Sequence, residues 1–531
     1  MSQSYDNSCS LVRVDHAVLL GGLKHVEAGY DQGLRCMEGT RKSLLKEITD
    51  WVTNDLGEED VLQSNTYWLY GSPGIGKTSL AHSICASLHD REQLAGAFFC
   101  RRDDVNLSEP GNILLTLTYK LARTFPPFRR IVARRLRNDP HLTSKSMKDT
   151  LFLDFIRSVP RHPKLPLVFV IDALDECGNT RSRPGILRVL TDAAREASWL
   201  KVIITSRPEV DIQHFFDSLA QSLHKRRDLA RDQEASVDLR TFAKSQFDLV
   251  ASDWHLATPW PEESLFNGII SRANGLFIFI KTLVLAFEQS DDPEKSLKEA
   301  LQDSGGTGLK PLYGLYSTIL KARRIPKNAD FLRVIGVLLA TAPYRPLCDD
   351  TIASLAGVRQ NLVQKWVDDL SSMLYRDETA NQGIRVRHLS ISEFFVSDHC
   401  NYQVKLQDAN AQLGIACLQT MIDQLCFNIC KLEDSRLANS DVQDLESRVK
   451  DNISDALQYS GLYWSNHLCF IPYNGDQRMV GTLKEFFEGV YPLFWIEMLS
   501  VTGMVPMGAP ILRKVLSWFK VSTALVCCWF A

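Results

Sequence analysis

The residues best suited to do chemistry lie in one short glycine-rich stretch. Residues 71–78 read Gly-Ser-Pro-Gly-Ile-Gly-Lys-Thr and fit the pattern G-x-x-x-x-G-K-[ST]. Glycines let the backbone turn tightly enough for successive N–H groups to face phosphate oxygens, and a following helix adds its positive end. Lys77 would reach the β- and γ-phosphates of a nucleotide, and Thr78 would place its hydroxyl on Mg²⁺. The predicted phosphate contacts are Gly71, Ser72, Pro73, Gly74, Ile75, Gly76, Lys77, Thr78 and Ser79.

A second chemical position ends the apolar run LVFVID, residues 167–172. A phosphate-binding loop of this kind works with a second parallel strand whose last residue is an acid that helps to hold Mg²⁺, and Asp172 occupies that place. Asp175 and Glu176 follow one turn later, where a carboxylate would orient or deprotonate the attacking water. The sequence does not choose between these two. The plainer alternative is a buried strand that ends in an acidic, helix-capping turn.

A third apolar run, KVIITS at residues 201–206, is followed by Arg207. Ligands of open α/β sheets bind at the carboxyl edge of the strands, where this arginine would lie. A planar, permanently charged guanidinium there would sense or stabilise the charge of a γ-phosphate. The alternative is a surface arginine before a proline.

These positions need a sheet to hold them, and the pattern from Tyr67 to Arg207 alternates apolar strands with periodic helices. That alternation predicts an α/β P-loop core with a parallel sheet and helices on both faces. Residues 36–52 read as a turn at Gly39 and an amphipathic helix. After Arg207 the strands are expected to stop, with a mostly helical stretch at 209–325 and a glycine-rich turn at 303–308.

Further along, three helices and two short strands between residues 331 and 388 are in the order of a winged helix, and a helical region follows at 408–470. Beyond it the periodic signal fades. The expected division is an N-terminal segment, a P-loop NTPase core, a helical domain, a winged-helix domain, a C-terminal helical domain and a tail, at residues 1–35, 36–210, 211–325, 326–400, 401–475 and 476–531.

Composition narrows the classes of partner. The 531 residues are 45% hydrophobic, which is ordinary for a globular chain of several domains. A net charge of −3 gives no global basic field, so nucleic acid or an anionic membrane would need a local patch. The basic run at 123–137 is more simply a solvated or inter-subunit face. The thirteen scattered cysteines favour a reducing, cytoplasmic location, and the apolar runs are too short to predict a membrane span.

The motifs CMEGTR, GSPGIGKTS, AFFCRRDD, LVFVIDALDE and IITSRPE together resemble the NACHT NTPase module of fungal NOD-like receptors. The module belongs to the STAND class and is also described as the nephrocystin-type N-terminal domain. The resemblance covers roughly residues 30–470 and is strongest at 67–210. It implies a switch that binds ATP or ADP with Mg²⁺, hydrolyses ATP slowly and controls self-association with unknown protein partners. Its expected setting is fungal non-self recognition or programmed cell death.

Two downstream segments extend the resemblance. The segment ANGLFIFIKTLVLAF is similar to the helical domain that closes over the nucleotide, although Gly275-Leu276-Phe277 replaces the Gly-Leu-Pro of many relatives. In the segment RHLSISEFF, the resemblance implies that His388 touches the β-phosphate of ADP and holds a closed state. A histidine satisfied within its own strand is the plainer alternative.

Alternatives to the switch remain. One is a motor or remodelling ATPase, and another is a nucleotide-independent scaffold. Without an Asn-Lys-x-Asp signature, ATP is preferred over GTP. Acidic residues beside Lys365 argue against DNA binding, and the spacing of Cys426, Cys430, His467 and Cys469 does not favour zinc. About 70 residues precede the loop and no repeat array follows residue 470, so a truncated product or an adaptor is expected.

Overall fold

The structure is a computed structural model that describes residues 20–529 apart from short gaps. The gaps are residues 22, 24, 54–63, 139–148, 160–162, 164, 233, 289, 291, 303–308, 379–380, 435 and 472–476. The chain divides into two compact units, Met1–Phe287 with Ser304–Pro311 and Glu288–Asp303 with Leu312–Ala531. The predicted turn at 303–308 and residues 1–19 of the predicted N-terminal segment lie outside the described residues.

The first unit is built on a five-stranded sheet in which every pairing is parallel. The strand order is β2-β3-β4-β1-β5. The strands are β1 (Thr66–Tyr70), β2 (Leu94–Phe99), β3 (Leu167–Asp172), β4 (Leu200–Ser206) and β5 (His224–Asp228). Because all strands run the same way, their carboxyl ends share one edge of the sheet. This confirms the predicted α/β core and brings the loop after β1 to the same edge as the ends of β3 and β4.

Strand β5 corrects the expectation that strands stop after Arg207. It pairs in parallel with β1 and forms one edge of the sheet. Its sequence, HKRRD, has no apolar run, and its side chains form surface ion pairs such as Lys225 with Glu47 at 2.8 Å. Edge strands commonly carry charges that discourage pairing with another chain. Hydrophobic pattern therefore could not reveal it.

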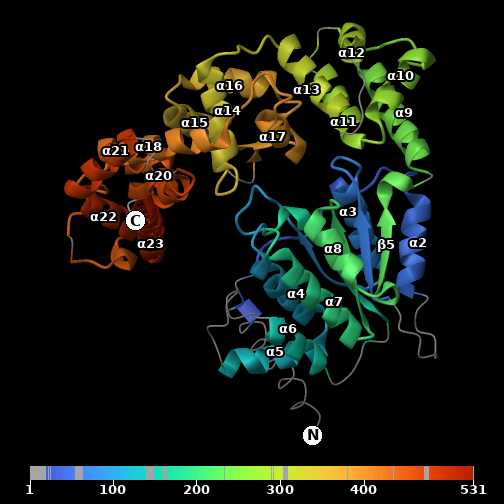
Figure 1. Ribbon diagram of the computed structural model, residues 1–531, viewed down its shortest axis with the longest axis horizontal. Helices are drawn as coiled ribbons and strands as arrows, with labels where there is room; N and C mark the ends of the chain where they lie inside the picture. Colours follow the sequence, from blue (N-terminus) through green and yellow to red (C-terminus); the bar gives the residue numbers. More distant parts are fainter. Residues whose placement is uncertain are drawn as a thin grey trace. The chain divides into compact units, whose positions relative to one another are not determined.

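Helices cover both faces of this sheet (Figure 1). Successive strand residues alternate between two hydrophobic clusters, since Tyr67 and Leu69 join one and Trp68 joins the other. Helices α2 (Lys42–Thr53) and α3 (Lys77–Asp90) supply the first cluster. The second cluster is supplied by α4 (Pro110–Thr124), α5 (Pro126–Asn138), α6 (Asp149–Arg157), α7 (Arg183–Glu196) and α8 (Val210–Ser218).

Three more helices complete the first unit and lie within the predicted helical stretch. They are α9 (Ala235–Asp253), α10 (Glu263–Ala273) and α11 (Phe277–Phe287). Phe247 of α9 is their aromatic centre, with ring centroids 5.9 Å from Trp260, 6.1 Å from Phe266 and 6.4 Å from Phe287. These contacts hold the three helices to one another.

The second unit is mainly helical. From Glu288 onward the elements are α12 (Pro293–Gln302), α13 (Lys310–Ala322), α14 (Ala329–Thr341), α15 (Asp349–Ala356), α16 (Gln360–Asp369), β6 (Leu374–Asp377), β7 (Gly383–Val386), α17 (Leu389–Val396), α18 (Leu406–Gln424), α19 (Leu445–Asn452), α20 (Asp455–Leu468), α21 (Gln477–Glu488), α22 (Tyr491–Val501) and α23 (Val505–Trp529). The order of three helices (α14–α16) and an antiparallel pair (β6 and β7) is as the sequence predicts. Their assignment as a winged helix stays a prediction, as does the division into six segments.

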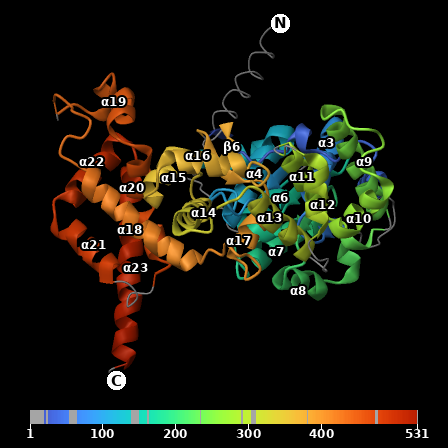
Figure 2. The ribbon, with the colours of Figure 1, turned by 90° about the horizontal axis from the view of Figure 1, so that it is seen from above.

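The helical periodicity of the sequence fades after residue 470, but the structure has three further helices there, α21 to α23. They pack with α18 and α20 (Figure 2). Helix α22 is apolar around most of its circumference and α23 contains Pro510, so neither shows a clean amphipathic period.

His467 of α20, a residue of the zinc alternative, forms hydrogen bonds through both ring nitrogens. Its partners are Tyr459 Oη and Asn410 Oδ1, each at 2.8 Å. Within the described part of the chain, none of the helices combines the length and the hydrophobicity of a membrane-spanning segment.

Candidate functional site

The glycine-rich loop joins the end of β1 to the start of α3, as predicted. Gly74 and Gly76 have φ angles of 79° and 95°, a region that glycine enters without strain. Lys77 Nζ donates to Gly71 O at 2.8 Å and to Ser72 O at 3.0 Å, and the side chain is buried. Burial lowers the pKa of Lys77, and the nearby Asp175 opposes that change. The loop therefore encloses one ammonium group among its own carbonyls.

Thr78 and Asp172, the predicted metal ligands, are brought together at the carboxyl edge of the sheet. Asp172 ends β3 and is only 2% exposed. Burial raises the pKa of Asp172, while hydrogen bonds from the hydroxyls of Thr205 and Thr78 lower it. The pair thus places one hydroxyl against one carboxylate immediately beside the loop.

Thr205 is a part of the site that received no role from the sequence. Its hydroxyl on β4 donates to Asp172 Oδ1 and accepts from the Ala173 backbone N–H at 3.0 Å. These two bonds orient the carboxylate from the neighbouring strand. The polar end of the run KVIITS was the signal available, because threonine and serine at the end of a buried strand lie at the ligand-binding edge.

Asp175 and Arg207 are paired with each other. Asp175 Oδ1 accepts from the backbone N–H of Arg207 at 2.9 Å, and its Oδ2 lies 3.2 Å from Arg207 Nε. Asp175 sits on the short helical turn Leu174–Glu176, which Ala173 introduces with a φ of 54°. The short turn after β3 and the first residue after β4 thus bring the Asp175 carboxylate and the Arg207 guanidinium, 32 residues apart in sequence, into contact.

Glu176 has a different environment from its neighbour. Its side chain is half-buried, and Oε2 accepts from the backbone N–H of Arg102 at 3.3 Å. Burial, together with the charge of Asp175, raises the pKa of Glu176 to about 7. Arg102 also donates through Nη2 to Asp175 O at 3.2 Å, a role that the sequence did not assign. Glu176 is thus held by a backbone N–H, whereas both carboxylate oxygens of Asp175 contact Arg207.

The loop is also contacted from two distant segments. The backbone N–H of Ile278 in α11 donates to Gly74 O at 3.2 Å, so the segment with the Gly-Leu-Phe departure reaches the loop. From the other direction, Arg41 Nη2 donates to Ile75 O at 3.1 Å. Of the remaining predicted loop residues, Ile75 is buried and Ser79 O accepts from Ser83 Oγ at 3.0 Å.

His388 lies in the second unit, between β7 and α17. Its Nδ1 accepts from the backbone N–H of Ser390 at 3.2 Å and lies 2.6 Å from Ser390 Oγ, which makes His388 the N-cap of α17. Ser390 Oγ in turn lies 2.8 Å from Tyr316 Oη. Each unit is described by itself, so contact between His388 and a phosphate stays a prediction.

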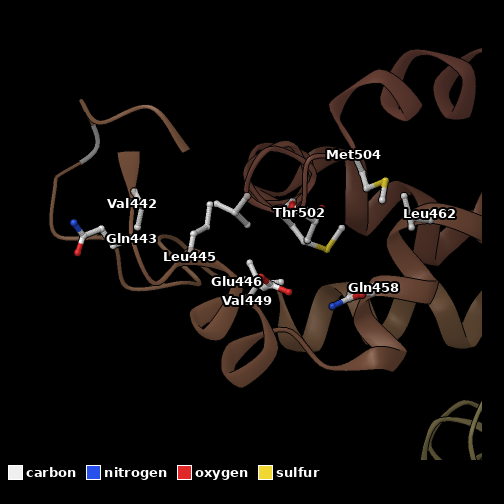
Figure 3. Close-up of a pocket in the computed structure, with 11 residues that line it drawn as sticks. Val442, Gln443, Leu445, Glu446, Val449, Gln458, Leu462, Thr502 and Met504 are labelled. Atoms are coloured by element: carbon white, nitrogen blue, oxygen red, sulfur yellow. Dashed lines mark hydrogen bonds between the residues drawn. The ribbon is translucent and has the colours of Figure 1, made fainter. Parts of the chain in front are cut away.

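A cavity of about 490 Å³ within the second unit does not share this chemistry. Side chains of α19, α20 and the segment after α22 converge around it (Figure 3). Its lining is mostly apolar, with Glu446 as the charged side chain and no basic one among the described lining residues. Such a cavity lacks the cation that a phosphate ligand needs, and the candidate site remains at the sheet edge.

The sheet order, the loop after β1 and Asp172 at the end of β3 define an α/β P-loop fold for the first unit. A family model described as Nephrocystin 3, N-terminal, matches residues 39–207. That range contains the loop and the acids of β3, and it agrees with the strongest part of the resemblance seen in the sequence.

The chain is also similar to solved structures at low sequence identity. The Walker-type ATPase paby2304 of Pyrococcus abyssi is 13% identical, with a TM-score of 0.34 over 70% of this chain and 99% of that chain. The Aeropyrum pernix ORC1 protein in complex with DNA is 12% identical, with a TM-score of 0.30 over 71% and 96%. Cdc6p from Pyrobaculum aerophilum is 13% identical, with a TM-score of 0.30 over 73% and 98%. No curated protein matches the chain.

Proposed function

We propose that the protein is a nucleotide-binding NTPase that acts as a switch of the NACHT and STAND class. The observation that carries this is the convergence of the buried Lys77, the Thr78 hydroxyl and the Asp172 carboxylate at one sheet edge. An ammonium inside a loop of glycines fits phosphate oxygens, and a hydroxyl beside a carboxylate fits Mg²⁺. ATP and ADP are the proposed nucleotides, with GTP as the alternative.

The residues have distinct proposed roles. Loop N–H groups and Lys77 would hold the phosphates, while Thr78 and Asp172 would hold Mg²⁺, whose positive charge offsets the charge that develops on the phosphates. Arg207, whose Nε lies 3.2 Å from Asp175 Oδ2, would contact the γ-phosphate. An arginine that senses the γ-phosphate but is already paired with an acid supports slow hydrolysis. The nucleotide that is bound, ATP or ADP, would then be the signal.

We propose Glu176 as the general base, because both oxygens of Asp175 are engaged with Arg207. With a pKa of about 7, Glu176 is protonated below that pH and cannot then accept a proton from water. ATP turnover should therefore fall as the pH drops through about 7. Glu176→Gln should lower turnover by about 10²-fold and remove that dependence. The measurement is steady-state phosphate release from pH 5.5 to 8.5.

Asp175→Asn is the matched variant for this prediction. The charge of Asp175 is one cause of the raised pKa, so its removal should move the midpoint of the profile to lower pH. An unchanged profile in Glu176→Gln would assign the base elsewhere.

The wider proposal covers self-association, protein partners and place of action. We propose that the winged-helix and helical segments move with nucleotide state, that His388 contacts ADP in the closed state, and that the switch acts in the cytoplasm in non-self recognition or programmed cell death. Nucleic acid is not a proposed partner, because Lys365 of α16 is paired with Asp369, and Asp368 with Arg376. That helix presents little free positive charge for phosphates.

One experiment separates this switch from its alternatives. Purified full-length protein is denatured and the released nucleotide is identified by mass spectrometry. The thermal midpoint is measured with and without Mg·ADP, and turnover is measured as steady-state phosphate release. A switch should release ADP, gain stability with added Mg·ADP and turn over less than about once a minute. Rapid turnover would support a motor or remodelling ATPase. A scaffold would carry no nucleotide and gain no stability.

A further inference from the structure

Arg41 lies before α2 and reaches the phosphate loop from a segment that the site does not otherwise use. Its guanidinium is buried and makes two hydrogen bonds in different directions. Nη2 donates to Ile75 O at 3.1 Å, and Nη1 donates to Asp232 Oδ2 at 2.8 Å. Asp232 lies 191 residues away in sequence, just before α9. One side chain therefore bridges the loop and the segment that leads into α9.

Two further contacts join Arg41 to α9 and α11. Its backbone N–H donates to Asp238 Oδ2 at 3.1 Å, and Nε lies 3.9 Å from the same oxygen. The guanidinium carbon lies 5.5 Å from the centre of the Phe277 ring, at the first residue of α11. The adjacent Ile278 N–H binds Gly74 O at 3.2 Å. Both helices thus meet the loop around this one arginine.

The electrostatics make the arrangement depend on an arginine. The side chains of Arg41, Asp232 and Asp238 are at most 8% exposed, so the guanidinium compensates carboxylates that are largely withdrawn from water. Arg227 Nη2 lies 3.7 Å from the other oxygen of Asp232. Burial raises the pKa of Asp238, and the charge of Arg41 opposes that rise. A rigid fork of donors binds a carbonyl and a carboxylate at once, whereas the single nitrogen of lysine at this reach does not.

The bond to Ile75 O also fixes the peptide that donates into the loop. The Ile75–Gly76 peptide is not among the cis bonds of the described residues, and a trans peptide directs its C=O and its N–H to opposite sides. While Arg41 holds the carbonyl, the N–H of Gly76 points away from Arg41. The orientation of a predicted phosphate donor is thereby tied to the ion pairs at α9.

We propose that Arg41 couples the phosphate loop to helices α9 and α11, so that nucleotide in the loop changes how firmly these helices are held. This coupling rests on the proposed nucleotide binding. Arg41 acts as a positioning residue, because it orients loop groups and touches no reacting atom. Arg41 acts on α9 through its contacts with Asp232 and Asp238.

The test compares hydrogen exchange by mass spectrometry on the full-length protein with and without Mg·ADP. In the wild type, Mg·ADP should slow exchange at the loop, across α9 and in the first turn of α11. Arg41→Lys should bind ADP roughly tenfold more weakly, as expected for one lost hydrogen bond to the loop. It should keep the protection at the loop and lose the ADP-dependent protection at α9 and α11.

Asp232→Asn tests the same coupling if Arg41→Lys does not fold. It weakens the contact between Arg41 and Asp232 and leaves the hydrogen bond from Arg41 to Ile75 O. Ser43→Ala is the control. Ser43 Oγ of α2 donates to Glu234 Oε2, at the N-cap of α9, in an exposed hydrogen bond that does not involve the loop. Full protection of α9 and α11 in Arg41→Lys and Asp232→Asn would overturn the coupling alone. A wild type that binds no ADP would overturn the proposed function and the coupling with it.

Discussion

Lys77→Ala is expected to raise the dissociation constant for Mg·ADP by about 100-fold or more. The ammonium is held inside the loop on Gly71 O and Ser72 O, where a phosphate would replace carbonyls as its partner. A hydrogen bond to a charged group contributes roughly 1.5–3 kcal/mol, and two such bonds to phosphate oxygens amount to about 3–6 kcal/mol. A titration that follows heat or a fluorescent ADP analogue measures the change directly.

The matched control for this variant is Lys120→Met. Lys120 is a half-buried lysine of the first unit, and its Nζ donates to Ala28 O at 3.1 Å and Ala97 O at 2.7 Å. Burial lowers its pKa as it does that of Lys77. The control thus removes a comparable group away from the loop and should leave ADP affinity near the wild-type value. Unchanged affinity in Lys77→Ala would mean that the loop is not a phosphate site.

Asp172→Asn is expected to abolish the dependence of ATP affinity on Mg²⁺ and to lower turnover by roughly 10²-fold or more. Asparagine keeps the shape of the side chain and its one oxygen can still accept the hydrogen bond from Thr205, but it lacks the charge that Mg²⁺ prefers. Burial raises the pKa of Asp172, so the ionised group is costly to the fold without a cation. The nucleotide-free variant should therefore unfold at the same temperature as the wild type or slightly higher.

The measurement for Asp172→Asn is a pair of ATP titrations, one with Mg²⁺ and one with a chelator, followed by phosphate release. Asp154→Asn, at an exposed aspartate of α6 paired with Arg157, serves as the control for the loss of one carboxylate. An Asp172→Asn protein whose ATP affinity still responds to Mg²⁺ would place the metal on other residues.

Much of the site was predictable because its parts are local. The spacing of Gly71 to Thr78 specifies the loop within eight residues, and a buried run ending in Asp172 specifies the acid at the end of its strand. Parallel strands align their carboxyl ends, so the apolar runs alone indicate that these parts meet at one edge. The pattern failed at β5, which is charged, and at α22, which is apolar on most sides.

The sequence by itself determined the phosphate loop, the core strands and the position of Lys77, Thr78 and Asp172, since each depends on neighbours within one turn or one strand. Only the tertiary structure decided that Asp175 pairs with Arg207, that Glu176 accepts from the backbone of Arg102, that Thr205 orients Asp172, and that Arg41 joins the loop to α9. These pairings form between segments that chain folding brings together. Their partners are set by geometry across the sheet edge, and no local spacing encodes it.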